Sequence, residues 1–178
     1  MNRAAIRRIA ARVNVGRGNR VPMGEFRALL GALGYHDVKT LLNSGNAVFT
    51  AKGGTARGIA ERIRSELAAR LGVDVSVIVK SAKEIGAIQA ENVLATRATD
   101  ASRLLVVLTR DSVALRGLAP IASLVESPER FHLGAHAAYL WCPNGILESK
   151  AGAALLGKQA RAGTTRNWAT VLKLGALL

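Results

Sequence analysis

Residue types that bind anions gather in one short segment near the start of the chain, NVGRGNRVPM at residues 14–23. Glycine lets a ligand approach the backbone closely, and the N–H groups that open a helix attract negative charge. Pro22, near the end of this segment, is expected at the first position of a helix. The sequence therefore predicts an anion-binding loop with contacts from Asn14, Gly16, Arg17, Asn19 and Arg20.

This loop does not match the established nucleotide-binding motifs. GRGNRV lacks the third glycine of G-x-G-x-x-G, and it lacks the Lys-Ser or Lys-Thr pair that completes a P-loop. The alternative interpretation is an ordinary strand-to-helix turn, in which the glycines serve geometry and the arginines are solvated.

A second polar group, NSGN at residues 43–46, has the composition of a tight hairpin turn. Gly and Asn tolerate positive φ, so we expect a structural role for this turn. Its polar residues would also line the site if the hairpin tip folds over the first loop. They are Ser44, Gly45 and Asn46.

The segment WCPNGILESK places a cation where a helix is expected to begin. Asn144 and Gly145 shape a turn, Ser149 is expected to cap the helix, and Lys150 follows the cap. A lysine is unfavourable beside the positive end of a helix dipole. Ser149 and Lys150 are therefore candidates for binding an anionic partner.

The segment GTTRNW repeats this arrangement near the end of the chain. Thr164 or Thr165 is expected to cap a helix, with Arg166 and Asn167 in its first turn and Trp168 packed inward. The arginine again occupies a position where an acidic residue is favoured. Thr165, Arg166 and Asn167 complete the set of candidate ligand-binding residues.

The residues do not define a catalytic centre. Cys142 lies in an apolar strand with no base beside it in the sequence, so a buried structural thiol is expected. His132 and His136 flank a predicted hairpin, but 1 Cys and 3 His do not supply a zinc site. Paired carboxylates and a G-x-S-x-G motif are both missing from the sequence. We predict no metal and no cofactor, and the sequence assigns no catalytic residue.

The composition is that of a basic protein with an aliphatic core. Of its 178 residues, 49% are hydrophobic and 4% aromatic, and 25 Lys and Arg against 12 Asp and Glu give a net charge of +13. Such a charge attracts polyanions. An anionic small molecule is the expected partner, with nucleic acid as an alternative through the net positive charge. The clustered aromatics and modules typical of nucleic-acid binding are missing.

A cytoplasmic location without a membrane partner is expected. The longest apolar runs fall well short of the ~20 residues that cross a bilayer. Arginines occupy the N-terminal positions where a secretory signal needs an apolar region. The single cysteine fits a reducing compartment. The sequence does not indicate an oligomeric state.

The first half of the chain predicts six elements in the order β-α-β-β-α-β. This is the split βαβ, ferredoxin-like order, in which an antiparallel sheet carries two helices on one side. After it, Ser81 and Glu84 form a capping box that opens a short helix. The six expected elements are a weak strand at 6–15, a helix at 22–34, strands at 37–42 and 46–50, a helix at 55–72 and a strand at 73–80.

The second half predicts nearly the same order. A polar stretch at 91–102 is expected to link the halves, and the last strand is expected to be replaced by a helix. The expected elements are a strand at 103–109, a helix at 111–127 broken near Pro120, a hairpin of 130–133 and 137–142, and helices at 149–158 and 165–178.

The predicted fold class is therefore α+β, with two ferredoxin-like halves and helices packed on antiparallel sheets. The first half spans residues 1–80. The capped helix and linker span 81–101, and the second half with its C-terminal helix spans 102–178.

Three segments resemble a known bacterial family, the domain-of-unknown-function 1697 family. They are NVGRGNRVPMGEFRALLGALGYHDVKTLLNSGNAVF, CPNGILESK and TTRNWATVLKL, in that order along the chain. The resemblance implies a pair of ferredoxin-like subdomains and no assigned activity. By this similarity, the polar residues of interest are Asn14, Gly16, Asn19, Ser44, Gly45, Asn46, Ser149, Lys150, Arg166 and Asn167.

The chain departs from the family pattern at its start. The family opens with an apolar strand that runs into Arg-Gly-Ile-Asn-Val-Gly, whereas here Ala11, Arg12 and Val13 precede Asn14. Arg7 and Arg8 also interrupt the expected strand. We therefore expect this strand to be frayed or shifted in register.

Three functions remain open from the sequence. The first is a binding domain whose loops form a basic, asparagine-rich pocket for a phosphate-bearing or other anionic ligand. The second is an enzyme acting on a phosphorylated small molecule, with Lys150 or Arg166 stabilising developing charge and Glu25 or Glu148 as the nearby acids. The third is a nucleic-acid-associated or scaffold protein in which these loops are simply turns.

Overall fold

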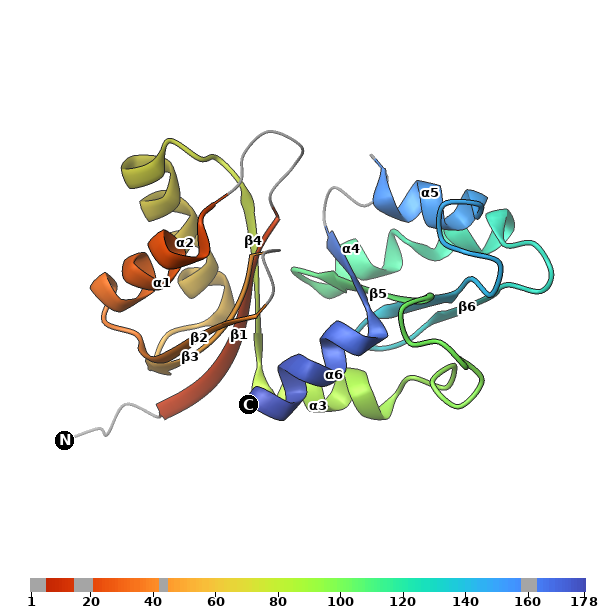
Figure 1. The fold of residues 1–178 in the computed structure, drawn as a ribbon, viewed down its shortest axis with the longest axis horizontal. Helices are drawn as coiled ribbons and strands as arrows, with labels where there is room; N and C mark the ends of the chain where they lie inside the picture. The colour runs from red at the N-terminus through yellow and green to blue at the C-terminus, as the bar shows by residue number, and fades with distance from the viewer. Residues whose placement is uncertain (1–5, 15–20, 42–44, 158–162) are drawn as a thin grey trace. The chain divides into compact units, whose positions relative to one another are not determined.

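The computed structural model describes residues 6–14, 21–41, 45–157 and 163–178. Its chain divides into two compact units (Figure 1). Unit 1 consists of Met1–Ile85 and Ala176–Leu178, and unit 2 consists of Gly86–Gly175. The predicted fold class is confirmed, because each unit contains an antiparallel four-stranded sheet with helices packed on it.

Unit 1 follows the predicted order of elements. The elements are β1 (Ile6–Asn14), α1 (Met23–Ala32), β2 (His36–Leu41), β3 (Asn46–Lys52), α2 (Ala56–Leu71) and β4 (Ser76–Ser81). The sheet has the strand order β2-β3-β1-β4, and every neighbouring pair is antiparallel. Each helix thus connects two strands that are not neighbours, as the split βαβ order requires.

The first strand forms despite its arginines. β1 pairs with β3 from Ile6 to Arg12 and with β4 from Ile9 to Asn14, each without a shift in register. Its central place in the sheet explains this result, because hydrogen bonds on both sides outweigh the poor strand propensity of the sequence.

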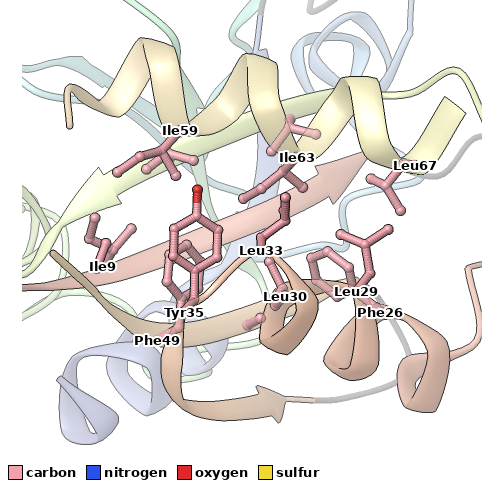
Figure 2. Packing of buried hydrophobic residues seen from close by; sticks show 14 of the residues in the cluster. Ile9, Phe26, Leu29, Leu30, Leu33, Tyr35, Phe49, Ile59, Ile63 and Leu67 are labelled. Carbon is pink, nitrogen blue, oxygen red and sulfur yellow. The ribbon is translucent and has the colours of Figure 1, made fainter. Parts of the chain in front are cut away.

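Aliphatic packing between the sheet and the two helices stabilises unit 1 (Figure 2). Phe26 and Leu30 of α1 and Ile63 and Leu67 of α2 are fully buried, as their helical spacing predicts. The rings of Tyr35 and Phe49 stack with their centroids 4.5 Å apart. A few aromatic side chains at the centre thus support a core that is otherwise aliphatic.

Unit 2 begins inside α3 (Ala82–Ala90), because its first residue is Gly86. The elements that follow are β5 (Leu104–Thr109), α4 (Ser112–Arg116), the 3-10 helix η1 (Ala119–Leu124), β6 (Arg130–Leu133), β7 (Ala138–Trp141), α5 (Lys150–Leu156), β8 (Gly163–Asn167) and α6 (Trp168–Leu177). The break expected near Pro120 separates α4 from η1. The expected hairpin forms from β6 and β7.

The end of unit 2 differs from the prediction. Residues 163–167 form β8, which pairs antiparallel with β5 and gives the sheet order β6-β7-β5-β8. The expected replacement of the closing strand by a helix is therefore wrong. Pairing with the fully buried β5 favours a strand over the capping propensity of Thr164 and Thr165, since strand formation depends strongly on tertiary context. Unit 2 thus repeats the strand order of unit 1.

In sheet B of unit 2 (β6-β7-β5-β8), the strand β5 is covered on both faces, since all six of its residues are buried. Leu105 and Val107 pack with residues of α4, η1 and α5. On the opposite face, the Tyr139 hydroxyl donates a hydrogen bond of 2.7 Å to the Ile88 carbonyl of α3. The continuous apolar run in β5 is typical of a strand with two covered faces.

Candidate functional site

One end of sheet A in unit 1 (β2-β3-β1-β4) brings together the ends of three elements. In the register of the sheet, Arg12 pairs with Asn46, and Leu41 pairs with Asn46 from the other side. β1 and β2 therefore run in the same direction, and both end at the edge where β3 begins. Asn14, the last residue of β1, lies two positions beyond Arg12 at this edge.

Helix α1 also begins at this end of the sheet. It connects the end of β1 to the start of β2, and the two strands are parallel, so the helix must run back from the Asn14 end toward His36. The sequence predicts Pro22 at the first helical position, whereas in the structure Pro22 is the capping residue and α1 starts one residue later, at Met23. The N-terminus of α1 and the ends of β1 and β2 thus share one end of unit 1 (Figure 1).

Within the described part of the chain, no side chain caps the first turn of α1. Pro22 occupies the capping position, and its side chain has no acceptor atom. The backbone N–H groups of Met23, Gly24 and Glu25 have no carbonyl partner within the helix. Gly24 and Glu25 are exposed. These amides form a local positive pole, and Glu25 is the one acidic residue in that first turn.

Asn46 is fully buried at this edge of the sheet. Its amide donates a hydrogen bond of 3.2 Å from Nδ2 to the Leu41 carbonyl, which joins the end of β2 to the start of β3. The neighbouring Gly45 has φ of 75°, as the turn composition predicts. Asn46 therefore fixes the hairpin that adjoins the site.

Five candidate residues lie outside the described part of the chain. They are Gly16, Arg17, Asn19, Arg20 and Ser44. The segments that contain them, 15–20 and 42–44, connect to the same end of sheet A, because Asn14, Leu41 and Gly45 adjoin them. The predicted roles of these five residues stay predictions.

In unit 2, Ser149 caps α5 as expected, with its hydroxyl accepting a hydrogen bond of 2.8 Å from the Gly152 amide. Lys150 follows the cap, and its ammonium group lies 2.7 Å from the Glu126 carboxylate. This hydrogen bond and the charge of Glu126 raise the pKa of Lys150. The anionic partner inferred for this lysine is therefore supplied, at least in part, by the chain itself.

The last three candidates lie in β8 instead of a helical first turn. Thr165 and Arg166 pair with Val107 and Val106 of β5, so neither is placed at a helix start. The expected threonine cap of the C-terminal helix is therefore wrong. The cap is Asn167, whose side-chain oxygen accepts a hydrogen bond of 3.0 Å from the Thr170 amide. The dipole argument made for Arg166 thus loses its basis.

The expected inward packing of Trp168 and burial of Cys142 are both confirmed. Burial raises the pKa of the Cys142 thiol, although a hydrogen bond with Ser149 opposes the effect.

Within the described ranges, no group of three His, Cys, Asp or Glu side chains is placed to hold a metal ion. No helix in those ranges is long and apolar enough to span a bilayer.

The strongest polar cluster in unit 2 was not predicted. Glu91 follows α3, and its carboxylate accepts hydrogen bonds from three successive backbone amides of the β6–β7 turn at distances of 3.0–3.2 Å. The Tyr139 hydroxyl, 2.8 Å away, adds a fourth donor and shares its single proton between this carboxylate and the Ile88 carbonyl. The cluster has all its partners within unit 2, so it stabilises the unit and does not form a binding site. The amides belong to Ala135, His136 and Ala137.

Positive charge is concentrated in unit 1. Its residues include 15 Lys and Arg against 6 Asp and Glu, whereas unit 2 has 10 against 6. Several acids of unit 1 are already paired with arginines on and beside α2, such as Glu66 with Arg70 at 2.5 Å and Asp74 with Arg64 at 2.9 Å. The larger excess of cations therefore lies in unit 1, which carries α1.

Comparison with known proteins identifies the family. The model of the DUF1697 family, proteins of unknown function, matches residues 11–139. The chain belongs to this family. The match covers the end of β1, the start of α1 and the β2–β3 hairpin, which form the edge of sheet A described above.

A solved structure of a protein of similar length has the same fold. The conserved bacterial protein SP0830 from Streptococcus pneumoniae superposes with a TM-score of 0.78 and 26% sequence identity. The similarity covers 97% of this chain and 99% of the other. No curated protein matches the chain significantly. The likeness to this structure supports the fold, and neither comparison names an activity.

Proposed function

We propose that this protein binds a phosphate-bearing or other anionic ligand at the end of sheet A where β1 ends and α1 begins. The observation that carries the proposal is the uncapped first turn of α1. Within the described residues no side chain caps its amides, and they lie at the same end of unit 1 as Asn14 and the Asn46 hairpin. Helix N-termini with free N–H groups bind phosphate and carboxylate groups in many proteins.

The charge of the sequence at this edge supports an anionic ligand. Arg17 and Arg20 lie between the end of β1 and the start of α1, so both are within a few residues of the first turn of α1 along the chain. A guanidinium group binds a phosphate through two parallel hydrogen bonds. In this proposal the two arginines supply the positive charge that attracts the ligand. The backbone amides of Met23, Gly24 and Glu25 donate hydrogen bonds to it. Asn46 holds the hairpin that shapes this edge of the sheet.

Two earlier candidates have a smaller part in this proposal. The Lys150 charge is offset by Glu126, and Arg166 donates a hydrogen bond of 2.7 Å to the Thr165 carbonyl. Both lie in unit 2, whereas the larger excess of positive charge and the start of α1 lie in unit 1. The proposal therefore rests on unit 1 alone.

Isothermal titration with inorganic phosphate and pyrophosphate tests the proposal. We expect Arg17→Ala/Arg20→Ala to weaken pyrophosphate binding by about tenfold or more, because a lost charged hydrogen bond costs about 1.5–3 kcal/mol. The control Arg57→Ala/Arg97→Ala removes the same charge from exposed positions elsewhere. Equal weakening in both variants would show only general charge attraction and would contradict a defined site.

A second variant separates the helix from the arginines. Glu25 places a negative charge in the first turn of α1, where it competes with an anionic ligand for the same positive pole. Glu25→Gln should therefore tighten pyrophosphate binding. The control Glu61→Gln, on the exposed side of α2, should leave the affinity unchanged.

The same titration over a range of salt concentrations distinguishes a small ligand from nucleic acid. A single-stranded oligonucleotide that contacts many cations loses affinity steeply with salt, with a slope that counts the phosphates bound. Pyrophosphate at one site shows a shallow slope. Tight oligonucleotide binding with no pyrophosphate binding would favour the nucleic-acid alternative.

A further inference from the structure

We propose that Gly86 is the flexible point of a hinge, at one of the two places, Gly86 and Gly175, where the chain passes between the units. Unit 1 ends at Ile85 and unit 2 begins at Gly86, within α3. The chain leaves unit 2 after Gly175, within α6. Both passages therefore occur inside a helix and at a glycine. This inference does not depend on the proposed anion site.

Gly86 has no steric reason to be glycine. A Cβ atom added at this position would meet nothing within 4 Å, and the residue is exposed. It lies inside α3, where glycine lowers helix stability relative to alanine because its backbone is freer in the unfolded chain. Glycine in a helix is also one of the recognised sites of bending.

The residues on either side of Gly86 are fixed to different units. Before it, the Glu84 carboxylate accepts a hydrogen bond of 2.9 Å from the Ser81 amide, and the Ser81 hydroxyl accepts one from the Glu84 amide. This is the predicted capping box. After it, Glu91 is held by the β6–β7 turn and the Ile88 carbonyl by Tyr139. Gly86 is thus a weak point between two anchored ends.

Gly175 is glycine for a different reason. A Cβ atom there would lie 2.2 Å from Nε2 of Gln89, which is far inside contact distance. The same Nε2 donates a hydrogen bond of 3.0 Å to the Val171 carbonyl of α6. Gln89 therefore ties α3 to α6 within unit 2, one turn before α6 leaves that unit. The two helices are joined to each other, and each leaves the unit at a glycine.

Such a hinge lets two compact units change orientation while each stays folded. Hinge motions are usually absorbed by a few residues at or near the ends of elements. Here the freedom would reside at Gly86, because Gly175 is already packed against Gln89. Replacing Gly86 by alanine should stiffen α3 without altering any packing contact.

Pulsed electron-spin distance measurements test this proposal on the full chain. Spin labels are attached at Ser65→Cys in α2 and Ser112→Cys in α4, both exposed, in a Cys142→Ala background. We expect a broad distribution of distances between the labels and a narrower one with Gly86→Ala. The control Gly31→Ala, also inside a helix with nothing within 4 Å of an added Cβ, should leave the width unchanged.

Two results would overturn the hinge. One is a distribution that is already narrow in the chain with Gly86 present. The other is the same width in the Gly86→Ala and Gly31→Ala variants. Circular dichroism and melting curves of each variant establish that the label distances are measured on folded protein.

Discussion

The Glu91 carboxylate accepts a hydrogen bond of 2.8 Å from the Tyr139 hydroxyl, across 48 positions of the sequence. The same carboxylate accepts bonds from three consecutive amides of the β6–β7 turn. One side chain thus fastens the end of α3 to the hairpin of sheet B. Hydrogen bonds to a charged group contribute more than neutral ones, so this contact is a principal polar support of unit 2.

Glu91→Ala should lower the free energy of unfolding by about 2 kcal/mol or more, because several charge-assisted hydrogen bonds are lost together. Urea unfolding measured by circular dichroism gives the value. Glu148→Ala removes an exposed carboxylate near α5 and should change stability by less than about 0.5 kcal/mol. Similar losses in the two variants would contradict the assigned role of Glu91.

Gly134→Ala should also destabilise unit 2. A Cβ atom at this position would lie 2.5 Å from Oε1 of Glu91 and 3.1 Å from the Ala137 carbonyl oxygen. The carboxylate must then shift away from the turn amides, at a cost of about 1 kcal/mol or more. Gly31→Ala, which meets no neighbour, should instead stabilise the protein by about 0.5–1 kcal/mol. Opposite signs in thermal melts are the expected result.

Stability should fall at alkaline pH partly because of Tyr139. Burial raises the pKa of Tyr139 far above its ordinary value of 10, and the hydrogen bond and charge of Glu91 raise it further. The unfolded chain releases the phenol proton above about pH 10 while the folded chain retains it, so the unfolding free energy decreases as pH rises past that value. Tyr139→Phe keeps the ring beside His132 and has no proton to lose.

Urea midpoints measured between about pH 8 and about pH 11 compare the two proteins across this range. The wild-type midpoint should decline more steeply than that of Tyr139→Phe above pH 10, although the variant is less stable at neutral pH through its lost hydrogen bonds. Parallel curves would show that Tyr139 is ionised equally in the folded and unfolded states.

The capping box of α3 predicts a loss of stability on the acid side. Burial opposes the ionisation of Glu84, but hydrogen bonds from Ser81 and the nearby Lys80 ammonium outweigh it and lower the pKa of Glu84 below its ordinary value of 4.5. The ionised Glu84 carboxylate therefore stabilises the folded chain above pH 4.5, its ordinary pKa. This stabilisation is lost as the pH falls through the lower pKa that Glu84 has in the folded chain.

Glu84→Gln tests this pH dependence, because glutamine keeps an acceptor for the Ser81 amide and has no acid titration. Its unfolding free energy should be lower than that of the wild type at pH 7, and the difference should shrink as the solution is acidified. A constant difference from neutral to acid pH would rule out the proposed role of the charge.

Local patterns predicted most of the fold. Helical spacing in the sequence puts Phe26 and Leu30 on one face of α1, where both are buried, and the Ser81 and Glu84 pair predicts the start of α3. β8 was missed because Thr-Thr-Arg-Asn has the residue types of a helix cap, and only its pairing with β5 makes it a strand. A strand that forms only because it pairs with a distant strand at the edge of a sheet leaves no pattern in its own residues.

The contacts of polar residues were the least predictable part of the molecule. Glu91 begins a polar stretch that reads as a linker, and its partners lie 44–48 positions away. The partner of Lys150 is likewise 24 positions distant. Residue type indicated that both are charged, but only the folded chain shows which charge each one meets. The candidate site in unit 1 was located by its turn residues, because a strand-to-helix turn is a local feature.

Amide chemical shifts on titration with pyrophosphate test the anion site most directly. Because the ligand should occupy the first turn of α1, the backbone amides of Met23, Gly24 and Glu25 should shift with one common, saturable affinity. The amides at the first turn of α2, which Thr55 already caps, serve as the internal reference and should not move. Shifts spread over exposed lysines and arginines of both units, with Gly24 and Glu25 unchanged, would contradict the account.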